Sequence, residues 1–506
     1  MMPKSTKNSP PTKRVQAAFL ATLGDRLFSQ PVPDELVANH ASYIRDASAK
    51  TMAHFHAFLS SRSLIFTWLH SALLGLATIL RDAFQSNYYS NANLTGDTRP
   101  CDVLVISHLT NTSQLAAQND PYFADLAQQL QALDGLKTTT FRVNQARTPL
   151  RGVELGTGQL LESGRFGFLE GCQTWIANAC QSLALLRRSC WEDDPDFKRF
   201  LRFLSCTQMD HRTMAARRIV KRVGHVVSLV QPKIVVLTYE GYSWERALAQ
   251  QLRRLNPAIQ ILGYQHAVIC GGARAINKKF AGGLSPDHIL AAGDAITARL
   301  VAESDYELSD FTIIGSAKAT HVNESPQGNA LVAVPEGTVS ETVVLAECLS
   351  AVAQQMPDMP CILRLHPALP WGRIKAKIRD WNAKSSNLSI SNISLDDDIG
   401  RAGWVLYRGS SVAITALLAN RQPLFFDCDD SADTGDIIPD EIRWRCICKT
   451  PGEVVATILA DGGESGRDDE ESKIGRQFAQ RYYRPLNHDL FNSTVKSYLL
   501  SDEENF

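Results

Sequence analysis

Short apolar runs that end in polar residues alternate with longer stretches of helical periodicity along most of the chain. Such runs are typical of buried strands, and strands that alternate with helices indicate parallel, doubly wound α/β domains. Between about residues 34 and 90 the pattern is helical only. The first series of predicted strands comprises 101–109, 137–143, 232–241 and 258–267.

The alternation is interrupted at 270–285, a basic, Gly-rich stretch that we interpret as the connection between two domains. A second series of predicted strands follows, at 287–293, 311–316, 330–337, 360–367, 388–392, 403–409, 422–427 and 443–448. We therefore predict the fold class α/β, with two Rossmann-like domains that face a cleft and an N-terminal helical extension. The predicted divisions are 1–100 (disordered tail and helical extension), 101–269 (first Rossmann-like, acceptor-side domain), 270–285 (linker), 286–466 (second Rossmann-like, nucleotide-binding domain) and 467–506 (C-terminal helix packing back on the first domain).

Composition narrows the class of protein but does not define its function. A chain of 506 residues suits two domains and an appendage, and 44% hydrophobic with 21% charged residues describes a soluble globular protein. The net charge of −1 gives no reason to expect nucleic acid as a partner. The 11 cysteines lack the spacing of metal ligands, so we expect free thiols in a reducing cytoplasm and no metal.

One apolar stretch near the N-terminus raises the question of contact with a membrane. Residues 63–80, "SLIFTWLHSALLGLATIL", contain no formal charge, but the stretch is short for a membrane span and includes Thr67 and His70. We expect a helix that packs against protein, while a membrane-surface helix or a span remains an alternative.

Polar clusters follow three predicted strands at the edge where ligands of open parallel sheets bind. Glu240-Gly241 follows "KIVVLT", His366-Pro367 follows "CILRL", and Arg408-Gly409-Ser410-Ser411 follows "WVLY". The two serine hydroxyls at a helix start either cap the helix or, with its free N–H groups, hold a phosphate. His366 is either a surface residue or a proton donor to a phosphate.

The candidates on the acceptor side come from the first series of strands. Glu240 either caps the next helix or acts as a general base or nucleophile. His108 follows the first strand, and Arg246 lies in the polar cluster that follows Glu240.

Together these motifs resemble those of bacterial GT-B glycosyltransferases that use CMP-activated sugars, namely sialyltransferases and Kdo transferases. The acidic-plus-glycine motif matches Glu240-Gly241, although Tyr239 stands where the family has its first carboxylate. The HP motif matches His366-Pro367, and the Ser/Thr pair matches Ser410-Ser411. The resemblance covers roughly 100–500 in architecture. It implies acid/base or nucleophilic work for Glu240 and contacts to the CMP phosphate for His366 and the two serines.

A second resemblance is to teichoic-acid polymerases, which transfer glycerol phosphate from CDP-glycerol. It rests on "GYQHAV", "RLHP" and "GSSVAITAL", and it implies that His266 is the catalytic base. More broadly, 238–267 looks like a segment of bacterial surface-carbohydrate biosynthesis proteins.

The function we expect is transfer of a CMP-activated ulosonic sugar, such as Kdo or a sialic-acid-like nonulosonate, to a surface glycan or glycolipid acceptor. The catalytic candidates are Glu240, His366 and His266; the nucleotide-binding candidates are His366, Pro367, Arg408, Gly409, Ser410 and Ser411; the acceptor-side candidates are His108 and Arg246. No cofactor or metal is expected. The expected location is the cytoplasm or the inner face of the cytoplasmic membrane, with contact through 63–80. The alternatives are a CDP-glycerol-type glycerophosphotransferase, a nucleotide-sugar 2-epimerase, and a non-catalytic assembly protein that keeps the fold.

Overall fold

The protein is described by a computed structural model that covers most of the chain. The residues it describes are 22–29, 31–39, 61–86, 94–96, 98–110, 114, 120–145, 155–162, 164–165, 167–269, 275–280, 282–320, 328–367, 369, 371–378, 381, 385–428, 435–460 and 470–500. The tail predicted as disordered at its start and the residues 270–274 of the Gly-rich stretch lie outside the described residues.

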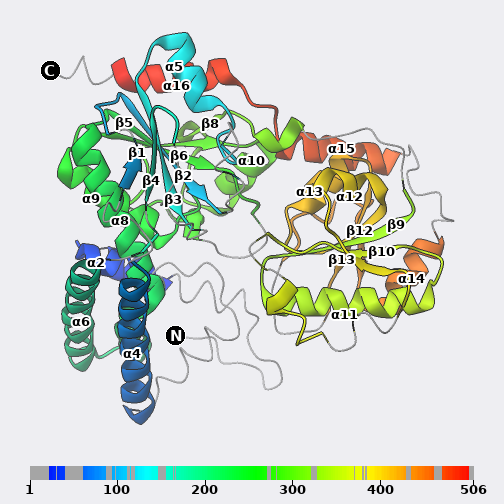
Figure 1. Ribbon diagram of the computed structural model, residues 1–506, viewed down its shortest axis with the longest axis horizontal. Helices are drawn as coiled ribbons and strands as arrows, with labels where there is room; N and C mark the ends of the chain where they lie inside the picture. Colours follow the sequence, from blue (N-terminus) through cyan, green and yellow to red (C-terminus); the bar gives the residue numbers. More distant parts are fainter. Residues whose placement is uncertain are drawn as a thin grey trace.

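The first domain is built on an eight-stranded sheet with the order β1-β4-β3-β2-β5-β6-β7-β8 (Figure 1). All neighbouring strands are parallel except β1, which is antiparallel to β4. The strands are β1 (Leu94–Gly96), β2 (Val103–Leu109), β3 (Thr138–Asn144), β4 (Gln159–Glu162), β5 (Ile234–Thr238), β6 (Gln260–Gln265), β7 (His288–Ala291) and β8 (Phe311–Ile313).

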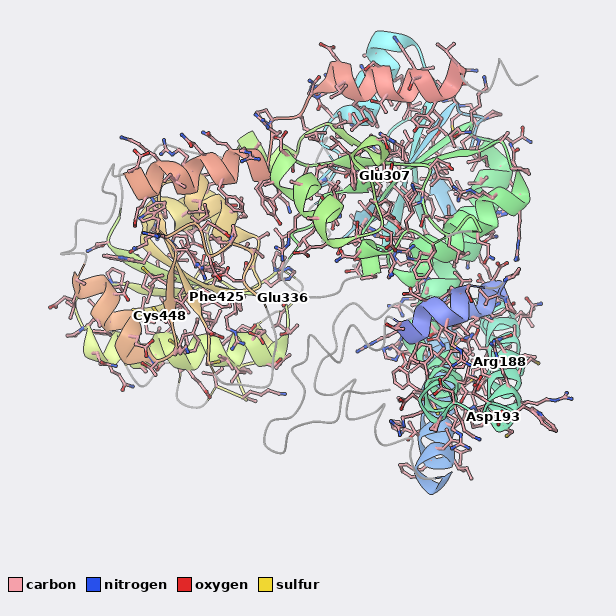
Figure 2. All side chains as sticks on the ribbon, turned by 180° about the vertical axis from the view of Figure 1, so that it is seen from behind. Arg188, Asp193, Glu307, Glu336, Phe425 and Cys448 are labelled. Carbon is pink, nitrogen blue, oxygen red and sulfur yellow. The ribbon has the colours of Figure 1, made fainter. Side chains whose placement is uncertain are left out.

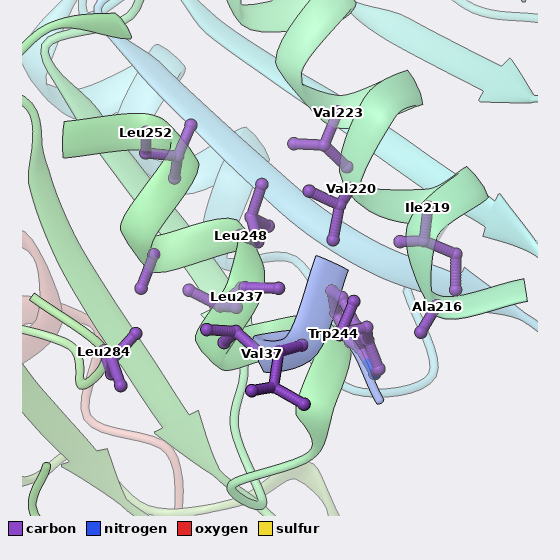
Figure 3. Packing of buried hydrophobic residues seen from close by; sticks show 14 of the residues in the cluster. Val37, Ala216, Ile219, Val220, Val223, Leu237, Trp244, Leu248, Leu252 and Leu284 are labelled. Carbon is purple, nitrogen blue, oxygen red and sulfur yellow. The ribbon is translucent and has the colours of Figure 1, made fainter. Parts of the chain in front are cut away.

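The central strands of this sheet are buried on both sides, because helices cover both of its faces. One face packs against α8 (His211–Val230) and α9 (Ser243–Leu255): valines of α8, together with Trp244 and leucines of α9, form one cluster with Leu237 of β5 (Figure 3). The other face packs against α5 (Leu126–Asp134). The remaining helical segments of this part are α10 (Asp294–Glu303), η2 (Ala275–Asn277), η3 (Leu308–Asp310) and η4 (Ala317–Thr320).

The change from one sheet to the other occurs later in the chain than predicted. β7 pairs with β6, and β8 pairs with β7, so both strands extend the first sheet. The stretch 270–285 is therefore a connection within the first domain, and the crossing to the second domain follows β8. An apolar run defines a strand but not its neighbours, so its sheet could not be assigned from sequence.

The second domain has a six-stranded, fully parallel sheet with the order β11-β10-β9-β12-β13-β14. One face packs against α11 and α14, and the other against α12 and α13. The predicted fold class, two Rossmann-like α/β domains of GT-B type, is thereby confirmed. The elements are β9 (Ala330–Pro335), α11 (Val339–Gln355), β10 (Cys361–Leu363), η5 (Trp371–Arg373), β11 (Leu388–Ile390), α12 (Leu395–Arg401), β12 (Ala402–Arg408), α13 (Val412–Leu418), β13 (Gln422–Phe426), β14 (Cys446–Cys448) and α14 (Pro451–Ala460).

The C-terminal segment returns from the second domain to the first (Figure 1). α15 (Glu470–Tyr482) packs on α13 and α10, and α16 (His488–Leu500) packs on α5 and β5. Between these helices the chain runs beside the crossing after β8: Ser316 N donates to Arg484 O and Asn487 N donates to Ile314 O, each at 2.8 Å. Gly315, with φ +86°, approaches Pro485 O so closely that a Cβ would collide with it.

A helical extension projects from the first domain, away from both sheets (Figure 1). It contains α2 (Asp34–Val37), α4 (Ser61–Ser86), α6 (Phe168–Cys190) and α7 (Pro195–Gln208), so helices from within the first domain contribute to it. In α4, Leu64–Phe84 is long and apolar enough to cross a membrane by length and composition, and 22% of its most apolar window is buried.

The return of α16 can be tested through Phe491, which is buried against the first sheet at 1% exposure. Phe491→Ala leaves a cavity, and we expect it to lower the free energy of unfolding by about 3–5 kcal/mol. The neighbouring Leu490, 36% exposed, provides the matched Leu490→Ala control with an expected loss below about 1 kcal/mol. The measurement is denaturant unfolding followed by far-ultraviolet circular dichroism; equal losses in the two variants would contradict the packing of α16.

Candidate functional site

Each sheet has one point where the chain reverses its direction of winding, and candidate residues lie beside both points. In the first sheet the chain runs from β2 to β3 and β4 on one side, and then to β5 on the other side. In the second sheet it runs from β9 to β10 and β11, and then to β12 on the opposite side. Such switch points leave space outside the carboxyl ends of the strands where ligands bind.

Glu240 and His266 meet at the carboxyl edge of the first sheet. They follow the adjacent parallel strands β5 and β6, and Glu240 Oε1 lies 3.8 Å from His266 Nε2. Both side chains remain partly accessible, at 18% for Glu240 and 12% for His266. The structure therefore brings together two catalytic candidates that two different resemblances implied separately.

The loop that carries Glu240 is held by a second carboxylate, that of Glu245. Its Oε2 accepts hydrogen bonds from Glu240 N at 2.9 Å and Tyr242 N at 2.8 Å. Burial, reinforced by the nearby Glu240 charge, raises the pKa of Glu245 well above its usual range. The helix-capping function considered for Glu240 thus belongs to Glu245, which leaves the Glu240 side chain for other contacts.

Gly241 fixes the path of this loop. Its φ is +76°, and a Cβ at this position would lie 2.6 Å from the backbone of Ala275 and Ile276. A side chain is excluded because the loop and η2 are in direct backbone contact.

Arg246 stabilises the contact between the Glu240 loop and η2 through buried hydrogen bonds. Its guanidinium is fully buried and donates to Ala275 O at 2.6 Å, Lys278 O at 2.8 Å and Ser285 Oγ at 3.2 Å. It also stacks on the Phe280 ring, with Cζ 4.6 Å from the centroid. The assignment of Arg246 as an acceptor-side residue is therefore wrong: its donors are engaged by the protein, and it positions the loop.

Aromatic rings line the site next to His266. Tyr122 packs edge-on against His266, with ring centroids 4.7 Å apart. Burial, with the charges of Asp120 and Glu240, raises the pKa of Tyr122 to about 12, so its hydroxyl is protonated at neutral pH. Tyr122 was not a candidate from sequence, because it lies in an irregular turn that follows no predicted strand.

His108 lies at the end of β2 but is enclosed in the wall of the site. Gln145 Nε2 donates to its Nδ1, and its Nε2 donates to Thr238 Oγ1, each at 3.0 Å. Trp244 packs edge-on against the ring at 5.5 Å. Because burial lowers the pKa of His108 to about 4, the imidazole is neutral and serves as a wall residue. His108 lies at the carboxyl edge of the first sheet, where the sequence placed it, but both of its ring nitrogens are already paired. Its contact with an acceptor stays a prediction.

Lys318 is a basic residue beside this site that the sequence did not reveal. It lies in η4, after the last strand of the first sheet, and its Nζ is 5.4 Å from the centroid of the Tyr483 ring. Burial lowers the pKa of Lys318, and the carboxylate of Glu240 opposes that shift. No motif accompanies Lys318; only its place after a strand of the first sheet could have identified it.

His366 lies at the carboxyl edge of the second sheet, directly against Gly337. A Cβ on Gly337 would lie 2.7 Å from His366 Nδ1, so the imidazole packs on the turn that follows β9. Partial burial lowers the pKa of His366, which favours a neutral ring that can donate one N–H. His366 and Pro367 are exposed, and the neighbouring Glu336 lies on the side of the second domain that is turned toward the first (Figure 2).

Ser410 and Ser411 follow β12, next to the turn that holds His366. Within the part of the chain that the structure describes, Ser410 Oγ accepts one long hydrogen bond, 3.4 Å, from Val412 N, and the Ser411 side chain makes no cap hydrogen bond. Their hydroxyls are thus not committed to capping α13, which is only seven residues long. Gly409, with φ +59°, separates them from the strand.

In the structure, Arg408 forms a buried ion pair and is not a charge available to an anion. Its Nε lies 3.0 Å from Glu341 Oε2, and both side chains are 2% exposed. Its guanidinium also contacts Cys428 Sγ. The positive charge expected to assist anion binding is therefore neutralised inside the domain, and Arg408 holds the turn in place.

Among the described residues, no group of three or more His, Cys, Asp or Glu side chains is arranged to hold a metal ion. The expectation that the reaction needs no metal stays a prediction.

Comparison of the sequence with protein-family models and with characterised proteins gives no match. Solved structures with a related arrangement include a UDP-GlcNAc 2-epimerase from Neisseria meningitidis bound to UDP-GlcNAc, with 9% identity, TM-score 0.44, and coverage of 79% of this chain and 100% of that one. MurG from Acinetobacter baumannii has 12% identity, TM-score 0.40, and coverage of 79% and 100%. A glycosyltransferase from Rickettsia africae has 10% identity, TM-score 0.41, and coverage of 80% and 98%. At these values the likeness is remote and does not extend to activity.

The buried state of His108 predicts a pH dependence of stability. The unfolded chain binds a proton at His108 below about pH 6.5, whereas the folded protein does so only near pH 4. Stability from His108 is therefore complete above about pH 6.5 and is lost as the pH falls toward 4, by up to about 3 kcal/mol. We expect denaturant unfolding of His108→Gln to depend less steeply on pH in this window, while the exposed His211→Gln retains the native slope. An unchanged slope in His108→Gln would contradict the neutral, buried imidazole.

Proposed function

We propose that the protein transfers a CMP-activated ulosonic sugar, such as Kdo or a sialic-acid-like nonulosonate, to a hydroxyl group of a surface glycan or glycolipid. The observation that carries this proposal is the 3.8 Å pairing of Glu240 and His266 at one carboxyl edge, with His366, Ser410 and Ser411 at the other. One edge offers a base and the other offers neutral hydrogen-bond donors, as displacement of a phosphate by an alcohol requires.

On the acceptor side, Glu240 and His266 would act as one unit. The acceptor O–H gives its proton to His266 Nε2, and the Glu240 carboxylate stabilises the imidazolium that forms. The acceptor oxygen bonds to the anomeric carbon as the bond from that carbon to the CMP phosphate oxygen breaks, and CMP leaves with the electron pair. This route inverts the anomeric centre.

On the donor side, the neutral His366 ring and the hydroxyls of Ser410 and Ser411 would donate hydrogen bonds to the phosphate. Charge that develops on the leaving oxygen is stabilised by donors already in position. An ulosonic sugar also carries a carboxylate, for which the protonated form of Lys318 would supply the opposite charge. The reaction would take place in the cytoplasm.

A nucleotide-sugar 2-epimerase is a second candidate, because the same Glu240–His266 pair could remove a proton from a sugar carbon. The CDP-glycerol alternative is less favoured, since it makes Glu240 dispensable although Glu240 is paired with the presumed base.

The nucleotide can be identified by thermal stability of the purified protein with CMP, CDP, UMP, UDP or GDP. At about a hundred times its dissociation constant, a ligand of the folded state adds about 2.7 kcal/mol. We expect the largest stabilisation from CMP and its loss in His366→Ala, whereas the exposed His211→Ala retains it. Stronger stabilisation by CDP than by CMP would favour glycerophosphate transfer. Stronger stabilisation by UDP would favour the epimerase. No stabilisation by any nucleotide would contradict the proposal.

The base is tested by Glu240→Gln and His266→Gln in a transfer assay with CMP-Kdo or CMP-sialic acid. Each substitution should lower kcat by about 10²–10⁴-fold and leave CMP binding unchanged, because both residues act on the acceptor side. Full activity of Glu240→Gln with an inactive His266→Gln would instead match the glycerophosphotransferase alternative.

A further inference from the structure

α4 is apolar on the side that faces away from the protein. Its buried positions include Ala72, Ile79 and Asp82, which face α6, α7 and α8. The outward positions span about half of the helix circumference at 100° per residue. Eight large apolar side chains on this side are 37–77% exposed, namely Ile65, Phe66, Leu69, Leu73, Leu74, Leu76, Leu80 and Phe84.

α6 continues the apolar surface beside α4. The two helices run antiparallel, because Trp68 Nε1 donates to Ser182 Oγ at 2.6 Å near one end and Gly171 contacts Ile79 near the other. Leu169, Ile176 and Leu183 form an exposed stripe on α6, at 75%, 57% and 56%. We call the outward faces of α4 and α6 the prong face; Figure 1 shows both helices projecting from the first domain.

The contacts of α4 argue against its crossing a membrane as a separate helix. Besides the Trp68 bond, Trp175 Nε1 donates to Ala72 O at 3.3 Å, and Asp82 is 3% exposed beside Arg81. A spanning helix would have to give up the polar and packing contacts along one whole side. The apolar side alone can instead lie in the interface of a bilayer.

The composition of the prong face also argues against a seam for a second copy of the helix. Coiled-coil seams are narrow and flanked by charged residues that select the partner. Here the apolar arc is wide, and the only formal charges between 63 and 84 are Arg81 and Asp82, which pair at 3.1 Å.

Cations are placed at the ends of the prong face and in the adjoining chain. Arg81 lies near the end of α4, and Arg187 and Arg188 are exposed in the last turn of α6, followed by the exposed Trp191. Four acidic residues come next: Glu192 and Asp194 pair with Arg26, Asp196 pairs with Arg199, and Asp193 is exposed (Figure 2). In sequence, 1–24 contains four Lys or Arg and no acidic residue, and 40–63 contains three Lys or Arg and one Asp. Apolar faces bordered by cations and tryptophan suit a surface of anionic lipids.

We propose that the prong face docks the protein on an anionic lipid bilayer, with α4 and α6 embedded on one side and no segment crossing. This inference is independent of the nucleotide chemistry, because none of the prong residues belongs to the candidate site.

The test is flotation of the full chain with vesicles of phosphatidylcholine alone or with phosphatidylglycerol. We expect at least about tenfold stronger partition into the anionic vesicles, weakened at about 0.5 M salt. The triple variant Phe66→Gln, Leu73→Gln and Phe84→Gln should reduce this partition at least about tenfold. The matched control, Leu308→Gln, Ile447→Gln and Leu459→Gln, changes side chains of similar exposure elsewhere and should bind normally.

Three results would overturn the proposal. The first is absence of binding to both vesicles, or equal binding by the wild type and the prong variant. The second is binding that survives alkaline carbonate extraction, which would mean a span. The third comes from sedimentation velocity without lipid. If the wild type is a dimer, the prong variant is a monomer and neither binds vesicles, the prong face contacts a second copy of the chain.

Discussion

The candidate site depends on one buried guanidinium, that of Arg246. A charge removed from water is tolerated only when its donors are satisfied, and here the carbonyls of Ala275 and Lys278 and the hydroxyl of Ser285 accept from it. These partners belong to the connection between β6 and β7, so the guanidinium ties that connection to the loop after β5. The Gly241 contact and the Glu245 bonds complete the same arrangement. These contacts fix the loop after β5 against the connection that follows β6, and so hold Glu240 and His266 opposite one another.

Much of the fold and part of the site could be predicted from the sequence, for physical reasons. Buried parallel strands appear as apolar runs, and their carboxyl ends identify the edge where polar residues gather, so Glu240, His366 and the serines were found as strand-end residues. Pairing between strands is non-local, and β7 and β8 were therefore placed in the wrong sheet. The charges of Arg246 and Arg408 were misjudged for the same reason: their partners are distant backbone carbonyls and the buried Glu341. Lys318 belongs to no motif, and only the folded chain brings it to Glu240.

The candidate residues at the edge of the second sheet carry no net positive charge from their own turn. Glu341 neutralises Arg408, His366 favours its neutral form, and the serines contribute only hydroxyl dipoles. These neutral donors select a ligand by the direction of its acceptor atoms, because hydrogen bonds weaken steeply when they are misaligned. Long-range attraction of charge contributes little. The edge of the first sheet, by contrast, contains the Glu240 carboxylate, the buried Glu245, whose pKa is raised well above its usual range, and Lys318, whose pKa is lowered by burial. The two edges therefore differ in electrostatic character as well as in residues.

The adjacent crossings between the domains have a mechanical consequence. The chain passes from the first domain to the second after β8 and returns between α15 and α16, and hydrogen bonds join these two passages at Ile314, Ser316, Arg484 and Asn487. Two linkers joined side by side restrict the relative motion of the domains more than a single linker would. Lys318 and Tyr483 contact one another within two residues of these hydrogen bonds, so a rotation at the crossings would move the Lys318 side chain relative to Glu240.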